Sequence, residues 1–329
     1  MGKRQPQQSK AQDHGPAAGS GGDRAGRAAR RAPWTAVPPS ALVLTGVFSV
    51  QIGAGLAAKL FTQIAPAAVT GLRLWTSAAV MAAVGARPLR NAITGLARRR
   101  AWRNAAVVAT FGVTLAVMNF SIYQSFARIP LGISVTVEFL GPLGLAVVTS
   151  RRLLDLLWVA LAGAGVALLA HGGLSTAAGR GTVAIGVAFA LLAALSWVGY
   201  ILLSRATGQR FGGSTGLTIA MVVAAVVITP VGVAAGGTTL LRPGILLTGL
   251  GIGLLSSIIP YSLEMEALRR IPPRVFGIWM SLEPAVAALV GLVLLGQSLA
   301  VREWLAIGCV MVACAGAARG AREPGAPEA

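Results

Sequence analysis

Three charged residues lie deep inside long apolar stretches of this sequence. If the stretches are membrane-spanning helices, Glu283 and Glu138 lie roughly 14 Å and 12 Å from the nearer membrane edge, and Arg73 lies about 9 Å from it. A charge at such depth costs at least about 2.5 kcal/mol on insertion scales, so it should face a wet cavity or a charged partner. The sequence therefore marks these three residues as candidate site residues.

These residue types could bind both ends of a zwitterion. Glu283 or Glu138 can hold an amine, and Arg73 can hold a carboxylate. Glu283 has no evident cation of its own, which favours a coupling role in which it alternates between a proton and a substrate amine. Arg73 and Glu138 could instead form a structural ion pair between two helices, and the sequence leaves that alternative open.

Weaker candidates flank these charges. Asn119 and Tyr123 are four residues apart, which puts them on one helix face, and Glu264 follows Tyr261 by three. Glu264 lies near a helix end, where a vestibule carboxylate and a residue extended toward the interface are both open interpretations. Four aromatic residues could instead line a cavity for a lipophilic cation: Trp75, Trp197, Tyr200 and Trp279.

Glu266 has a simpler interpretation. It precedes Arg269 by three residues and Arg270 by four, the spacing of side chains that pair on a helix surface. We expect a surface ion pair here, outside any binding site.

The elements that must position these residues are apolar helices. Apolar residues make up 55% of the chain, and the mean hydropathy is +0.73. These values indicate an all-α integral membrane protein with many spans, and alternating strands of a membrane barrel are absent. We expect ten spans, near 41–60, 65–85, 105–127, 131–149, 153–171, 182–204, 215–235, 244–267, 274–296 and 301–318.

The positive charge follows a topological pattern. The formal net charge is +18, and an arrangement with a cytoplasmic N-terminus puts twenty-two of the 28 basic residues on the inner side and four in the outer loops. This bias predicts cytoplasmic termini in a cell membrane. It also explains the charge without nucleic acid, which we do not expect as a partner.

The chain contains an internal repeat. A shift of 142 residues aligns "RIPLGISVTVEFLGP" (128–142) with "RIPPRVFGIWMSLEP" (270–284). Each half would have five spans, and an odd number makes the second half enter the membrane from the opposite side. We therefore expect two inverted five-helix repeats, an arrangement found in several secondary transporters, whose substrate sites lie near the midplane.

The expected segments follow from this repeat. They are a disordered basic tail over 1–40, a first repeat over 41–171, a second repeat over 182–318 and a short tail over 319–329.

Enzyme chemistry has little support in the sequence. There is no HExxH, GxSxG or P-loop pattern and no cluster of histidines, and two cysteines do not make a metal site. We expect no cofactor, no metal and no enzymatic activity; a membrane-embedded enzyme is the least favoured alternative.

Two strings carry a family resemblance. "VEFLGPLGLAVVTSRR" (137–152) and "IPYSLEMEALRRIPPRVFGIWMSLEPAVAALVGLVLLG" (259–296) resemble the EamA family of the drug/metabolite transporter superfamily, most of all its threonine/homoserine exporters. The resemblance covers roughly 41–318 and implies ten helices in two inverted repeats and export of metabolites. One departure is Gln297, where the family commonly has glutamate. An amide cannot carry a proton, so a proton-carrying role of that glutamate does not transfer to Gln297.

Two transport functions remain after these exclusions. The first is a secondary exporter of small amino acids, coupled to proton entry by alternating access. The alternative keeps the fold and exports drugs, lipophilic cations or another metabolite. The expected partners are a small-molecule substrate, the lipid bilayer and protons, and a homodimer is left open.

Overall fold

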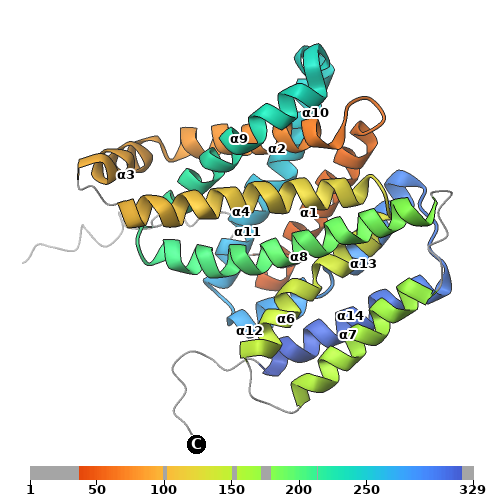
Figure 1. Ribbon diagram of the computed structural model, residues 1–329. Coiled ribbons are helices and arrows are strands. Elements are labelled where there is room, and N and C mark those ends of the chain that lie inside the picture. Colours follow the sequence, from red (N-terminus) through yellow and green to blue (C-terminus); the bar gives the residue numbers. More distant parts are fainter. Residues whose placement is uncertain (1–36, 99–101, 150–153, 172–178, 213, 321–329) are drawn as a thin grey trace, which may run out of the picture. The chain divides into compact units, whose positions relative to one another are not determined.

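The computed structural model describes residues 37–98, 102–149, 154–171, 179–212 and 214–320. Within these ranges every regular element is a helix (Figure 1). The predicted tail over 1–40 lies almost entirely outside the described residues, as does most of the tail over 319–329. In chain order the helices are α1 (Pro39–Leu60), α2 (Pro66–Val84), α3 (Ala86–Arg98), α4 (Trp102–Phe126), α5 (Leu131–Glu138), α6 (Leu140–Thr149), α7 (Leu154–His171), α8 (Arg180–Gly208), α9 (Thr215–Gly236), η2 (Gly237–Leu241), α10 (Pro243–Gly253), η3 (Leu254–Ile258), α11 (Ile259–Leu268), α12 (Pro273–Met280), α13 (Glu283–Leu295) and α14 (Val301–Gly320).

The helices make this a multi-pass membrane protein. In the described ranges, nine helical segments are long and apolar enough to cross a bilayer, some of them built from two consecutive helices. The expected segment at 153–171 corresponds to α7, whose apolar part, Leu156–Leu169, is shorter than the others. The all-helical class is confirmed, and nine of the ten expected spans appear as candidates of full length.

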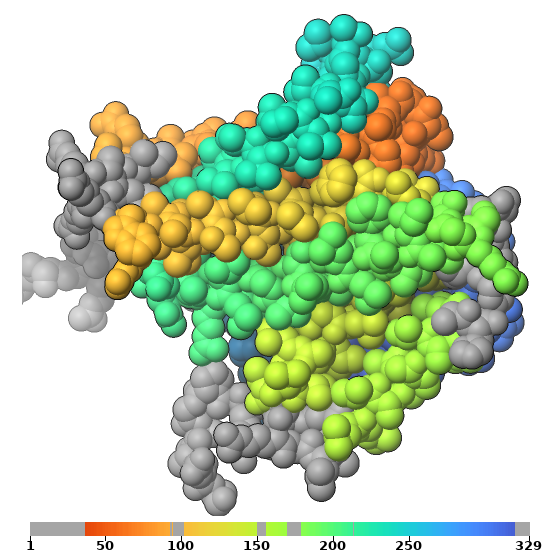
Figure 2. Space-filling view, in the orientation of Figure 1, coloured from red at the N-terminus to blue at the C-terminus, as the bar shows by residue number. Residues whose placement is uncertain are grey.

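The outer surface is apolar, as the surface of a protein in lipid should be. Helix α8 forms much of the face seen in Figure 2, and its large exposed side chains include Ile185, Leu191, Leu195 and Leu202. Such a surface would be an aggregation hazard in water, whereas it costs nothing against hydrocarbon.

Small residues allow the helices to approach closely. Helix α5 packs against α13, and a Cβ atom added to Gly132 would lie 2.6 Å from the Cβ of Ala288. Helices without a hydrophobic driving force between them associate through such close van der Waals packing. The helices α4 and α8 lie side by side along their length, and α7 packs along α14 (Figure 1).

Two membrane segments are broken at corresponding positions. Helix α5 ends at Glu138 and α12 ends at Met280, which are 142 residues apart, and each lies four residues before a proline. Pro142 and Pro284 have no N–H to donate to the carbonyl groups of Glu138 and Met280, so the α-helical bond cannot form there. The two helix breaks therefore fall at positions that the predicted repeat aligns.

A third irregularity lies in the segment α10–η3–α11. Here η3 is a π-helical turn, in which the N–H of Ile259 donates to the carbonyl of Leu254, five residues earlier. Two carbonyl groups of this turn bond to other helices instead. Leu255 O accepts from Ser49 Oγ of α1 at 2.7 Å, and Ser256 O accepts from the Arg73 side chain of α2 at 3.0 Å. Turns of this kind often occur at functional sites.

Candidate functional site

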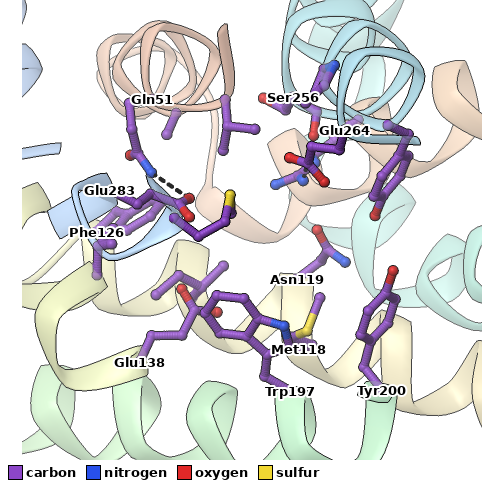
Figure 3. A pocket seen from close by; sticks show the side chains of 18 residues that line it. Gln51, Met118, Asn119, Phe126, Glu138, Trp197, Tyr200, Ser256, Glu264 and Glu283 are labelled. Atoms are coloured by element: carbon purple, nitrogen blue, oxygen red, sulfur yellow. Dashed lines mark hydrogen bonds between the residues drawn. The ribbon is translucent and has the colours of Figure 1, made fainter. Parts of the chain in front are cut away.

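A cavity of about 160 Å³ lies between the broken helices and their neighbours. Its walls come from α1, α2, α4, α5, α8, η3, α11, α12 and α13, and Figure 3 shows the labelled side chains directed toward a common space. Six of the seven predicted site residues line it: Arg73, Asn119, Glu138, Tyr261, Glu264 and Glu283. Residues separated by more than 200 positions in the chain thus share one polar site.

Trp279 is the exception. It lines a different groove with Leu282 and Met311, while the next residue of α12, Met280, lines the cavity. Neighbouring residues on a helix point about 100° apart, and on α12 it is Met280 that faces the cavity. The structure therefore does not bring Trp279 together with the other six predicted site residues.

Glu283 is the first residue of α13 and is almost completely buried. Its Oε1 accepts a hydrogen bond of 2.8 Å from Gln51 Nε2 of α1 (Figure 3). The exposed fractions of Glu283 and Gln51 are 8% and 2%. Glu283 Oε2 and the amide oxygen of Gln51, Oε1, have no hydrogen-bond partner among the described residues. This pair therefore presents two buried acceptors without a donor, and unpaired buried polar groups of this kind are rare.

Arg73 presents the opposite chemistry. Its Nη2 donates to Ser256 O at 3.0 Å, its Nη1 lies 3.5 Å from the Tyr123 hydroxyl, and its guanidinium lies 5.5 Å from the centroid of the same ring. Pro260 explains the first contact, because it has no N–H for the carbonyl of Ser256 four residues earlier. Arg73 Nε and Ser256 Oγ are buried and have no partner in the part of the chain that the structure describes.

The structure also decides two ion-pair questions. Arg73 and Glu138 form no ion pair within 4 Å in the described ranges, so the structural pair considered from the sequence is not formed. Glu266 does pair with Arg269, at 3.6 Å, and with Arg270. That surface pair was predicted from helical spacing and is confirmed.

The remaining predicted residues occupy different parts of the wall. Glu264 is half-buried and lies beside Gly46 of α1, in contact with the cavity, which favours the vestibule over an extension toward the interface. Asn119 is buried, and its Nδ2 donates to the carbonyl of Leu115 on its own helix at 2.8 Å. Trp197 completes the apolar side of the wall and packs edge-to-face on Phe139, with ring centroids 4.9 Å apart.

Ser256 was missed in the sequence. Its signal is the string "SSIIP", in which Pro260 follows Ser256 by four residues and must free its carbonyl.

No residue in the described ranges belongs to a group of three or more His, Cys, Asp or Glu side chains that could hold a metal ion.

Comparisons with known proteins identify the family of this chain. The chain is 37% identical to the "Threonine/homoserine exporter RhtA" of Escherichia coli (strain K12) over 278 residues, which cover 84% of this chain and 90% of the relative. The corresponding exporter of Salmonella typhimurium (strain LT2) is 36% identical over the same coverage. The EamA-like transporter family matches residues 184–319. The chain belongs to this family.

Other similarities are weaker. The "Uncharacterized transporter YwfM" of Bacillus subtilis is 29% identical over 127 residues, 39% of this chain and 43% of the relative. One solved crystal structure, 18% identical, superimposes with a TM-score of 0.54 and covers 84% of this chain and 96% of its own. That likeness concerns the fold alone.

The departure from the EamA family pattern at Gln297 has a structural explanation. Gln297 Oε1 accepts a hydrogen bond of 3.0 Å from the backbone N–H of Leu131, the first residue of α5. The first N–H groups of a helix have no partner within the helix, so an oxygen acceptor is needed there whether or not it can titrate. Gln297 is outside the cavity lining, and its amide is sufficient for this role.

Proposed function

We propose that this protein is a secondary exporter of small amino acids such as threonine and homoserine. The substrate class follows from the names of its 36–37% identical relatives, which are threonine/homoserine exporters. The single observation that supports it most is the polar asymmetry of the cavity. Two buried acceptors without donors lie on Gln51 and Glu283, and two buried groups that can donate lie on Arg73 and Ser256.

A free amino acid would satisfy both sets of groups. Its ammonium group would donate to Glu283 Oε2 and Gln51 Oε1, and its carboxylate would accept from Arg73 Nε and Ser256 Oγ. Hydrogen bonds in which one partner is ionised are about twice as strong as neutral ones, and the buried setting strengthens them further. A cavity of about 160 Å³ suits a small solute.

Proton entry would drive export. Glu283 can hold a proton or a substrate amine, but not both, so alternation between these states couples the two fluxes. One elementary charge moving through 100 mV supplies about 2.3 kcal/mol, which supports roughly a fifty-fold outward gradient of a neutral solute. Glu138 and Glu264 line the same cavity and would tune substrate binding.

The architecture that we propose has ten spans in two inverted repeats, with both termini in the cytoplasm of a bacterial cell. The equal bounds of α5 and α12 at a shift of 142 support the duplication. The broken segments would flex during alternating access, because helices hinge most readily where a backbone hydrogen bond is missing. A reporter active only outside the cytoplasm, fused after Ala329, should stay silent.

Export of lipophilic cations is the second candidate. Three carboxyl groups and the indole of Trp197 line the cavity beside one guanidinium, and aromatic faces attract cations. Arg73 argues against this candidate, because its buried Nε has no partner among the described residues and such a cargo offers no group for that donor.

Efflux from loaded proteoliposomes decides between these functions. Vesicles containing labelled threonine, homoserine, larger amino acids or a lipophilic cation would be assayed with and without an imposed pH gradient. The proposal expects gradient-dependent efflux of threonine and homoserine. Efflux of the cation without that of the amino acids would favour the second candidate.

A further inference from the structure

A second cavity adjoins the first and has a different character. It measures about 460 Å³ and lies where the end of α2 meets α3, the start of α9 and the segment η3–α11. Aliphatic side chains dominate its wall, with Val80, Met81 and Leu217 among them. We refer to it as the α2–α11 groove.

Two hydroxyl groups of the α2–α11 groove already have partners. Thr218 Oγ1 donates to Ser214 O at 3.0 Å, and Ser262 Oγ donates to Ile258 O at 2.7 Å, each within one turn. These groups call for no polar ligand. The groove is therefore suited to an apolar chain, and it lies in a molecule whose outer surface is made for hydrocarbon.

Helix α3 adds a basic group at the mouth of the α2–α11 groove. It begins two residues after α2 ends, and Pro88 of α3 lines the groove. On either side of Pro88, Arg87 and Arg90 are exposed, whereas Leu89 packs against the core formed by α2, α4 and α9. The α3 sequence "ARPLRNAITGLAR" contains no acidic residue. A basic amphipathic helix at the end of a membrane span typically lies in the interface and attracts anionic lipid.

We propose that the α2–α11 groove and α3 together bind one anionic phospholipid. An acyl chain occupies the groove, and the phosphate group lies against Arg87 and Arg90. The charge complementarity favours this occupant over a zwitterionic phospholipid, because the phosphate of a zwitterionic lipid is already offset by the cation of its own headgroup.

The bound lipid would affect the transport site through Tyr261. This side chain lines both the α2–α11 groove and the central cavity, so it forms part of the wall between them. A lipid chain packed on one side of Tyr261 restricts the conformations that the ring can adopt on the other side. Lipid binding is nevertheless measurable without transport, so its failure and that of the proposed amino-acid export are distinguishable.

Native mass spectrometry of the detergent-solubilised protein tests the headgroup. Phosphatidylglycerol or phosphatidylcholine would be titrated onto wild-type protein and onto the Arg87→Gln/Arg90→Gln variant. Each arginine near an anionic lipid contributes a factor of about five, so the variant should bind phosphatidylglycerol roughly 25-fold more weakly. Binding of phosphatidylcholine should not change. The matched control is Arg180→Gln/Arg242→Gln, which removes two exposed arginines from the starts of α8 and α10.

A second variant tests the acyl chain. Ser262 is exposed, lines the α2–α11 groove and bonds only to its own helix among the described contacts, so Ser262→Phe fills the groove at little cost to folding. Retention of both lipids should fall in this variant. Equal binding of the two lipids by wild-type protein, or equal loss in the control variant, would overturn the headgroup assignment. Unchanged retention in Ser262→Phe would overturn the groove assignment. The assignment would also be overturned if the wild-type protein were a lipid-free dimer and Ser262→Phe a monomer, because a second copy of the chain would then occupy the groove.

Discussion

The two broken segments share one backbone course and carry different chemistry. Helices α5 and α12 each have eight residues. Each follows a proline with φ near −56° and ψ near 145°, and each is followed by a residue with φ of −64°. The residues at equivalent positions differ. Glu138 at the end of α5 corresponds to Met280 at the end of α12, and Glu283 at the start of α13 corresponds to Gly141 in the first segment. The carboxyl groups are thus one turn apart in equivalent structures.

Packing explains why the first segment has no carboxyl group at the position equivalent to Glu283. A side chain at position 141 would overlap the backbone carbonyl of Ala194 in α8, so the first segment has no room for the counterpart of Glu283. At position 283 the side chain instead finds Gln51 as a donor. Residues at both breaks line the same cavity, and the neighbouring helix decides which position has room for a carboxyl group.

Gly141→Ala should give the largest loss of stability, because the added Cβ atom meets backbone that cannot rotate away. We expect the free energy of unfolding to fall by about 3 kcal/mol or more, at the upper end of overpacking effects. Thermal unfolding in detergent measures this. The matched control is Gly144→Ala in the same helix, where nothing lies within 4 Å of the added atom, and the helix should be unchanged or slightly more stable. Equal melting temperatures of the two variants would contradict the packing argument.

Arg73→Ala should raise the threonine concentration for half-maximal efflux by tenfold or more. A hydrogen bond to a charged group contributes about 1.5–3 kcal/mol, and every tenfold change corresponds to about 1.4 kcal/mol. Arg73→Lys should be only slightly better, because an ammonium group cannot donate to the Ser256 carbonyl and to a substrate from the geometry of the planar guanidinium. A wild-type concentration dependence in Arg73→Ala would show that Arg73 only packs.

Gln51→Leu sharpens the comparison between the two carboxyl groups. It removes the side-chain donor of Glu283, so we expect about a tenfold loss in apparent threonine affinity with normal insertion in the membrane. Ser49→Ala on the same helix is the control, since its hydroxyl bonds the π-helical turn and lies outside the cavity lining. Equal affinities of the Gln51→Leu and wild-type proteins would mean that the Gln51–Glu283 pair is not part of the amine subsite.

Gln297→Leu should have the smallest effect. Without its oxygen, the N–H of Leu131 at the start of α5 loses its acceptor, which should cost about 1 kcal/mol of stability, as for a lost helix cap. Gln297→Glu keeps an acceptor and should melt at the wild-type temperature and export normally. A large gain or loss of pH dependence in Gln297→Glu would give this position a coupling role that its location outside the cavity lining does not suggest.

Much of this structure follows from the sequence because insertion in a bilayer restricts the solutions. Apolar length predicts the spans, and helical spacing predicts the Glu266 pair. The breaks after Glu138 and Met280 lie where Pro142 and Pro284 each remove a helix hydrogen bond. Tertiary contacts were harder to predict. The rotation of α12 decides that Met280 and not Trp279 faces the cavity, and the π-helical turn supplies the Ser256 carbonyl to Arg73 in place of Glu138. Neither depends on residues that are close in sequence.

The central claim is that Glu283, and not Glu138, couples the proton to the substrate. Efflux of threonine from proteoliposomes at saturating concentration, with and without a pH gradient, tests it most directly in Glu283→Gln and Glu138→Gln. Glutamine keeps the shape and hydrogen bonding of glutamate but cannot bind a proton, so the comparison isolates titration. We expect that Glu283→Gln inserts normally but loses the acceleration by the gradient, whereas Glu138→Gln keeps it with weaker binding. Gradient-driven efflux at the wild-type rate in Glu283→Gln would show that Glu283 is not the coupling group.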